Sequence, residues 1–336
     1  WALHAEALPE ASATLAAAAE DPAVDMVFAD RFGPLEGRGE GLAAGLEAAF
    51  AARIPMLLPV RSEFFAAWAT RAEARGLDWA PVPLTLSGLR RWRGPWRLRE
   101  ALIRATPADP ARRVILGRNW ILVEGPRGVG LASAPPGDAP LIRAVEGDLA
   151  GRSLASLAAG ARGDDPLAAA IGWAAINAAR NTPDHAAEPA EGITALRARA
   201  SARPGPLLVV GAFPNLDRVA PEALVLERRP APGQAPDSAA WRLVPQASGV
   251  VVTATALRDG SAFHLMDWAT GPVALVGPGT PMDPMAFRYG VDVLGGFIVE
   301  DADLAARLVA EGAGARRLKA AGRAVALTRP EAEGAF

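Results

Sequence analysis

The residues of this 336-residue chain with the clearest chemical potential stand where short apolar runs end. Gly211, Glu227 and Thr253 each end or directly follow such a run. A glycine lets the backbone approach a ligand closely, a carboxylate accepts hydrogen bonds or binds a metal, and a hydroxyl donates or accepts. Because ligands of an open parallel sheet bind beyond the carboxyl ends of its strands, these residues predict a ligand site at one edge of such a sheet.

A second site element is the segment Gly277-Pro278-Gly279-Thr280-Pro281, which follows an apolar run and precedes a predicted helix. Its backbone amides could hold a carboxylate or a phosphate. The same glycines and prolines also suit an ordinary turn between a strand and a helix. The predicted ligand-binding residues are Gly211, Phe213, Glu227, Thr253, Thr255, Gly277, Gly279, Thr280 and Asn119.

Ordinary structural roles compete with these assignments. Glu227 lies 16 positions after Gly211, close to where Rossmann proteins place an acid on ribose hydroxyls, but no GxGxxG motif accompanies it. A solvated carboxylate paired with Arg228 or Arg229 is the alternative. The alternative for Thr253 and Thr255 is an ordinary structural role, because β-branched residues are common in strands. The sequence leaves these pairs of interpretations open.

Metal ligands must come from oxygen and nitrogen donors, because the chain has no cysteine. The three histidines, His4, His185 and His264, are far apart in the sequence. His264 and Asp267 are three positions apart on a predicted helix and therefore share a face, although polar pairs at this spacing are common without a metal. The predicted metal ligands are Glu227, Asp259 and His264.

The overall charge excludes some partners. A formal net charge of −2 and a pI near 6.0 give no basic field for nucleic acid or an anionic membrane, and no apolar stretch is long enough to span a bilayer. We expect a cytoplasmic protein with a small-molecule or metal-chelate ligand, and a homo-oligomer stays open. The first residue is Trp1, so we expect a truncated chain whose missing segment could have carried a nucleotide-binding loop or an export signal.

Residues 1–82 are predicted to form part of an α/β domain. Alanine-rich helices alternate with two apolar strands, and the first strand ends in a polar turn that contains Arg31, Glu36 and Arg38. This turn is either a phosphate-proximal or metal-proximal loop, or a solvated one. The predicted elements are helices at 11–20, 41–52 and 62–74, strands at 26–29 and 54–60, and a proline-rich linker at 80–87.

Residues 92–190 predict an α+β domain. A helix at 96–105 precedes three short strands that suggest an antiparallel meander, and helices at 153–159 and 166–181 follow. Asn119 and Glu124 are expected to project toward a cleft. Asn177, on an apolar helix, is expected to satisfy backbone groups.

Residues 205–326 alternate strands and helices, which predicts a doubly wound parallel sheet. The strands are expected at 207–210, 223–226, 249–253, 273–276 and 294–299, and the helices at 237–244, 261–269, 283–289 and 301–311.

Residues 92–326 resemble a bacterial family described as "putative heavy-metal chelation". The segments that carry the resemblance occur in the same order, and they are 115–120, 167–177, 210–214, 226–228, 252–257 and 275–281. The resemblance implies an enolase N-terminal-like domain followed by a Rossmann-like domain.

The first region resembles a bacterial family of unknown function that is related to nucleoside triphosphatases and associated with molybdenum genes. Residues 30–39 and 54–60 carry this second resemblance. No GxxxxGK[ST] motif occurs in the chain, so we predict no independent nucleoside triphosphate hydrolysis.

The leading hypothesis is that the protein binds a metal, a metal chelate or a small anionic ligand in the cleft between the enolase-like and Rossmann-like domains, in heavy-metal or molybdenum handling. One alternative is a nucleotide-dependent transferase or lyase of chelator or metallocofactor metabolism, and another is a non-catalytic scaffold. The cofactor is left open between a metal ion and a nucleotide, and the sequence selects no reaction.

Overall fold

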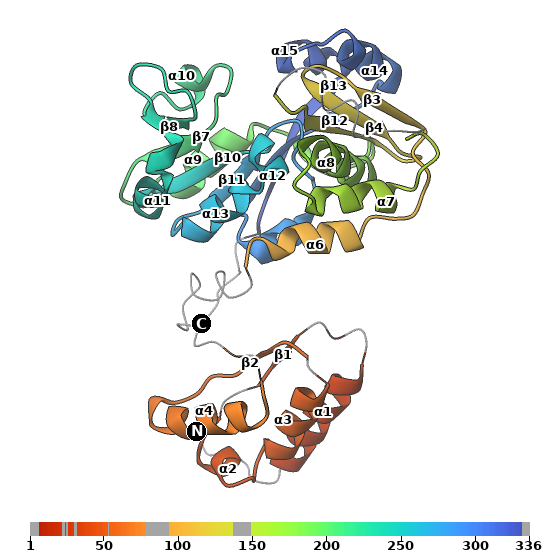
Figure 1. Ribbon diagram of the computed structural model, residues 1–336. Coiled ribbons are helices and arrows are strands. Elements are labelled where there is room, and N and C mark those ends of the chain that lie inside the picture. Colours follow the sequence, from red (N-terminus) through yellow and green to blue (C-terminus); the bar gives the residue numbers. More distant parts are fainter. Residues whose placement is uncertain are drawn as a thin grey trace. The chain divides into compact units, whose positions relative to one another are not determined.

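The computed structural model describes residues 7–21, 24, 26–29, 32–52, 54–77, 79, 94–136 and 149–330. The chain divides into two compact units, Trp1–Gly88 and Leu89–Phe336 (Figure 1). His4, Arg31 and the predicted linker at 80–87 lie outside the described residues. No helix in the described part of the chain is long and apolar enough to cross a bilayer.

The first unit surrounds a small parallel pair of strands, β1 (Val27–Phe28) and β2 (Met56–Leu57). Its core contains Phe32 and Trp68, whose rings meet edge to face with centroids 5.5 Å apart. The helices of this unit are α1 (Leu8–Glu20), α2 (Pro34–Gly37), α3 (Ala43–Ala51) and α4 (Phe65–Ala74), with a 3₁₀ turn at Ser62–Phe64.

The polar turn after β1 has a structural centre. The Glu36 side chain is buried, and its carboxylate accepts hydrogen bonds from the backbone N–H groups of Gly33 at 3.0 Å and Leu42 at 3.1 Å. Arg38 is exposed and faces Glu40 at 3.6 Å. Glu36 therefore holds the loop together, a structural role that neither interpretation of this turn included.

The second unit is built on an eight-stranded sheet with the order β6-β13-β12-β11-β10-β7-β8-β9. The central strands are parallel, as predicted, whereas β13 and β6 join one edge in antiparallel pairing and were not predicted. The strands are β6 (Glu188–Pro189), β7 (Leu207–Val210), β8 (Leu224–Glu227), β9 (Ala235–Pro236), β10 (Gly249–Thr253), β11 (Val273–Val276), β12 (Val293–Val299) and β13 (Gly322–Thr328).

Both faces of this sheet are buried, which explains its continuous apolar strands. Helix α9 (Gly192–Ala200) packs Ile193 and Leu196 on one face, against Val209 and Val251. The other face, with Val250 and Val252, joins the largest apolar cluster. That cluster includes α8 (Pro166–Arg180), α11 (Ala240–Leu243), α12 (Thr255–Arg258) and α13 (Ser261–Trp268).

The predicted antiparallel meander is present as β3 (Arg113–Leu116), β4 (Trp120–Glu124) and β5 (Val129–Ser133). One of its faces packs on α8, and the other packs Leu122 and Leu131 with Phe297 of β12 and with α14 (Ala302–Ala310). The Asp165 carboxylate caps α8 by accepting from the Leu167 N–H at 2.9 Å. The remaining helices are α6 (Arg97–Arg104), α7 (Leu154–Ala158), α10 (Leu216–Val219) and α15 (Ala315–Leu318).

Two predicted helices differ in detail from the structure. The segment Pro284–Tyr289 forms a 3₁₀ helix, entered through Asp283, whose carboxylate accepts from the Met285 N–H. The helix expected at 237–244 is divided into the 3₁₀ turn Asp237–Ala239, α11 and the 3₁₀ turn Val244–Gln246. Pro245 removes one backbone donor in the last of these turns.

The side chains of Asn177 in α8 and of Asn181, the C-cap residue of that helix, bind the backbone of the Gly277–Pro281 segment. Asn177, fully buried, donates from Nδ2 to the carbonyls of Leu131 at 2.7 Å and Gly279 at 2.9 Å. One turn later, Asn181 donates to the Thr280 carbonyl at 3.0 Å and accepts from the Met282 N–H at 2.9 Å. The segment is thereby fixed by two side-chain amides of a helix that is remote in sequence.

Replacement of Asn177 with alanine should lower the free energy of unfolding by about 2–4 kcal/mol, because two buried carbonyls lose their donor. Urea denaturation would measure this loss. Asn119→Ala is the matched control, since that exposed amide donates to one carbonyl, of Gly312 at 2.8 Å, and its loss should cost about 0.5 kcal/mol. Equal losses in the two variants would contradict the role of Asn177.

Gly130 should be irreplaceable, because a Cβ at this position would overlap the Ala174 carbonyl oxygen of α8 and lie 2.8 Å from the Asn177 carbonyl carbon. We expect Gly130→Ala to cost about 3 kcal/mol or more. Gly163→Ala is the control, because a Cβ there meets its nearest neighbour at 3.6 Å. Thermal unfolding compares the two, and a Gly130→Ala melting temperature close to that of the control would refute the close packing of β5 on α8.

Candidate functional site

A cavity of about 400 Å³ opens beyond the carboxyl ends of β7, β8 and β10. Strand β7 lies between β8 and β10 in the sheet. The chain passes from β7 to β8 on one side, whereas on the other side it passes from β10 to β11, away from β7. Such a reversal of strand order is where ligands of open parallel sheets bind. The cavity volume lies within the range of small-molecule sites.

The floor of the cavity depends on one backbone conformation. Gly211, directly after β7, has a backbone φ of +103°, which residues other than glycine rarely adopt. A Cβ on Gly211 would also lie 2.8 Å from Cγ2 of Thr253. The glycine therefore lets the end of β7 lie against Thr253 without closing the cavity.

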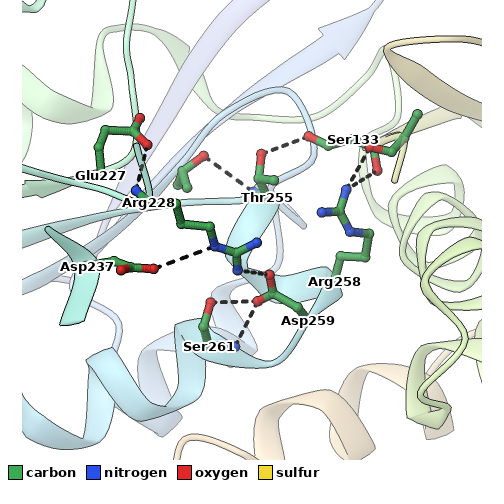
Figure 2. Close-up of polar contacts among 10 residues, drawn as sticks. Ser133, Glu227, Arg228, Asp237, Thr255, Arg258, Asp259 and Ser261 are labelled. Atoms are coloured by element: carbon green, nitrogen blue, oxygen red, sulfur yellow. Dashed lines mark hydrogen bonds and ion pairs between the residues drawn. The ribbon is translucent and has the colours of Figure 1, made fainter. Parts of the chain in front are cut away.

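Arg228 brings a positive charge to a lining that also contains the carboxylates of Glu227, Asp237 and Asp259. Its polar contacts are drawn in Figure 2. Its guanidinium donates to Asp259 at 2.5 Å and lies 3.7 Å from Asp237, so it connects the end of β8 with two loops. The hydrogen bond from Arg228 to Asp259 raises the pKa of the guanidinium. Because 62% of its side chain is exposed, Arg228 keeps donors available to a ligand.

Asp259 anchors this arrangement. Its carboxylate also accepts from the Ser261 hydroxyl at 2.6 Å and from the Ser261 N–H at 3.1 Å (Figure 2). Burial alone would raise the pKa of Asp259, but the bonds from Ser261 and the contact with Arg228 outweigh it, so the pKa lies below its usual value of 3.8. Asp259 is therefore ionised near neutral pH and holds Arg228 in place.

Glu227 is half-buried and lines the same cavity. Its carboxylate accepts from the Arg228 N–H at 3.2 Å. Within the described residues it forms no ion pair, because the guanidinium of Arg228 is turned to Asp259 and Asp237. The Arg228 guanidinium therefore pairs with Asp259 and Asp237 rather than with Glu227.

An aromatic wall completes the cavity on α13. The rings of His264 and Trp268 have centroids 6.0 Å apart and an interplanar angle of 31°, and both line the cavity. Asp267 is exposed on the same helix but is outside the lining, so the predicted pairing of His264 with Asp267 does not contribute to the cavity.

The antiparallel meander supports the site from outside the lining. The Ser133 hydroxyl of β5 shares a hydrogen bond of 2.8 Å with the hydroxyl of Thr255, which lines the cavity (Figure 2). Arg258 donates to the carbonyls of Ser133 at 3.1 Å and Ala134 at 2.7 Å, and burial lowers the pKa of its guanidinium. The lining itself comes from residues 210–268, so this cavity belongs to the parallel sheet and its helices.

The structure brings together most, but not all, of the predicted residues. Those that line the cavity are Gly211, Glu227, Thr253, Thr255, Asp259 and His264. Phe213 instead packs with the apolar cluster around α9, and Asn119 bonds to the Gly312 carbonyl. Gly277, Gly279 and Thr280 are outside this lining, with the Gly279 and Thr280 carbonyls bound by α8.

The sequence interpretation missed the contributions of Arg228, Asp237, Ser261 and Trp268 to the lining. Arg228 had a sequence signal, since it follows Glu227 at a strand end, but it was interpreted only as a partner of that carboxylate. Asp237 lies in a 3₁₀ turn and Trp268 at the end of α13, and tertiary packing brings both to the cavity. The spacing of residues along the sequence therefore does not indicate their role.

The three predicted metal ligands, Glu227, Asp259 and His264, share the cavity. Across the parts of the chain that the structure describes, however, no three His, Asp or Glu side chains are grouped closely enough to hold a metal ion. Asp259 is bound by Arg228 and Ser261.

Three segments of the chain match models of known protein families. Residues 196–328 match the DUF364 family model and residues 99–180 match the DUF4213 model, and both carry the description "Putative heavy-metal chelation". Both matches lie within the larger unit. The resemblance drawn from the sequence is confirmed. Residues 2–92 match DUF2478, a family described only as being of unknown function.

Two solved structures agree with this assignment. A DUF364 protein of unknown function from Desulfitobacterium hafniense is 27% identical, with a TM-score of 0.63, over 71% of this chain and 99% of its own. A DUF364 protein from Pyrococcus horikoshii, 17% identical with a TM-score of 0.59 over 70% of this chain and 99% of its own, shares the fold. No curated protein matches the chain.

The lowered pKa of Asp259 predicts an acid-dependent contribution to stability. Because the folded pKa lies below the unfolded one, this stability is present above pH 3.8 and is lost as the pH falls through the folded pKa. Asp259→Asn should therefore cost about 1 kcal/mol at pH 7, a value limited by solvent screening, and the difference from the wild type should shrink toward pH 3. Urea denaturation across this range, with Asp267→Asn as control, tests the sign; a difference that grows on acidification would contradict it.

Proposed function

We propose that the cavity beyond β7, β8 and β10 binds a metal chelate, that is, a metal ion carried by a small organic anion. The observation that carries this proposal is the cavity at the reversal of strand order. Its lining combines the guanidinium of Arg228, the imidazole of His264 and the carboxylate of Glu227, which forms no ion pair among the residues that the structure describes. Its volume of about 400 Å³ suits an organic molecule rather than a bare ion. The family description supports a metal as part of the ligand.

Arg228 is proposed to bind the anionic part of the ligand. Its guanidinium has five N–H donors, and Asp259 orients it while the contact with Asp237 is long, at 3.7 Å. An incoming carboxylate or phosphate can take the donors that face Asp237. The ionised Asp259 then acts through Arg228 and positions it.

His264 is proposed to contact the metal ion, because imidazole is a good ligand for transition metals and the side chain is exposed in the cavity lining. Glu227 is proposed to contact the polar groups of the organic part or, as first predicted, the metal. The organic molecule supplies the other metal ligands. A role in molybdenum handling, the cytoplasmic location, a homo-oligomer and a nucleoside-triphosphatase-like first unit stay predictions.

The function can be tested with nickel citrate as the probe chelate. We expect the full chain to bind preformed nickel citrate at least tenfold more tightly than free Ni²⁺ in isothermal titration calorimetry. Arg228→Ala should weaken the binding of nickel citrate and of citrate alone, each by about tenfold, because both carry the anion. His264→Ala should weaken only the metal-loaded form.

Glu222→Ala is the control, since this carboxylate pairs with Arg197 at 2.6 Å and lies outside the cavity lining. Its affinity should equal that of the wild type. If free Ni²⁺ binds as tightly as nickel citrate, the proposal of a chelate site is wrong, and if nickel citrate does not bind, citrate-like chelates are excluded from the site.

A further inference from the structure

The unpaired Glu227 carboxylate identifies the kind of organic molecule that the cavity can take. Glu227 ends β8, the strand beside β7, and Gly211 directly follows β7. In Rossmann proteins an acidic residue about 20 positions after the glycine-rich turn accepts a hydrogen bond from the ribose 2′-hydroxyl, and Glu227 lies 16 positions after Gly211. The single Gly211 brings the backbone close but gives no glycine-rich cradle for a pyrophosphate between two nucleosides.

Arg228 and Asp259 keep this carboxylate available. The Arg228 guanidinium is held at 2.5 Å by Asp259, which Ser261 holds in turn at 2.6 Å. Glu227 thereby retains a charged acceptor that faces the cavity, and charge-assisted hydrogen bonds are the strong ones. A ligand with two adjacent hydroxyl groups satisfies both carboxylate oxygens.

The aromatic wall adds a second requirement. Trp268 and His264 present tilted rings on α13, and Trp268 is 37% exposed. A flat ring of a ligand can pack on such a surface, as nucleobases do on aromatic side chains. The same cavity therefore offers an acceptor for a diol, a surface for a planar ring and a cation for an anionic group.

We propose that the organic part of the chelate is a ribonucleotide whose ribose hydroxyls donate to Glu227, whose base packs on Trp268 and whose phosphates face Arg228. The phosphates of such a ligand carry the metal ion, and few protein ligands are then needed. This inference rests on the proposed function, since it names the ligand of the same cavity.

The test compares Mg²⁺–ADP with Mg²⁺–2′,3′-dideoxy-ADP, which lacks both hydroxyls, by calorimetry on the full chain. We expect the wild type to bind ADP about tenfold or more tightly than the dideoxy analogue. Glu227→Ala should remove this preference by weakening ADP alone. Trp268→Ala should weaken both nucleotides about equally and leave the preference.

Glu222→Ala serves again as control and should retain the wild-type preference. Equal wild-type affinities for the two nucleotides, or a preference that survives in Glu227→Ala, would overturn the inference. If nickel citrate binds and neither nucleotide does, the inference fails and the proposed function stands. If neither chelate nor nucleotide binds, both fail, whereas a Glu227-dependent preference for ADP without citrate binding supports the nucleotide and rejects citrate-like ligands.

Discussion

The chain leaves the neighbouring strands β7 and β10 in opposite directions, and the position of the cavity depends on this reversal. Loops that run away from each other leave a space between the ends of the two strands. The surrounding residues then decide only what fills it. Gly211 keeps the space open at the end of β7, and α11 and α13 provide its apolar side.

The orientation of each charged side chain in the cavity depends on a contact with the next one. Ser261 fixes Asp259, Asp259 fixes Arg228, and the resulting direction of Arg228 leaves Glu227 unpaired. Two adjacent residues of opposite charge, Glu227 and Arg228, would otherwise neutralise each other. A carboxylate 31 positions away along the chain separates them.

The fold was largely predictable because its central strands are buried on both faces and therefore have continuous apolar sequences. The edge strands β6 and β9 were missed because each has only two residues, and β13 was missed because Gly322–Thr328 mixes apolar and polar residues. The ends of β7, β8 and β10 could be predicted as site positions, since strand direction alone places Gly211, Glu227 and Thr253 at one edge. The Gly277–Thr280 segment has an equally suggestive sequence, but Asn177 and Asn181 of α8 bind it, and only tertiary packing reveals that.

The hydrogen bond between Ser133 and Thr255 has a consequence for how this architecture can change over generations. It joins a strand of the 99–180 segment to the cavity wall of the 196–328 segment, and Arg258 binds the same strand end. A substitution of Ser133 in β5 would therefore disturb the wall of the proposed ligand site in the other segment. We therefore expect the two segments to be inherited together. A recombination that exchanges only one of them between relatives must preserve the hydrogen bond between Ser133 and Thr255.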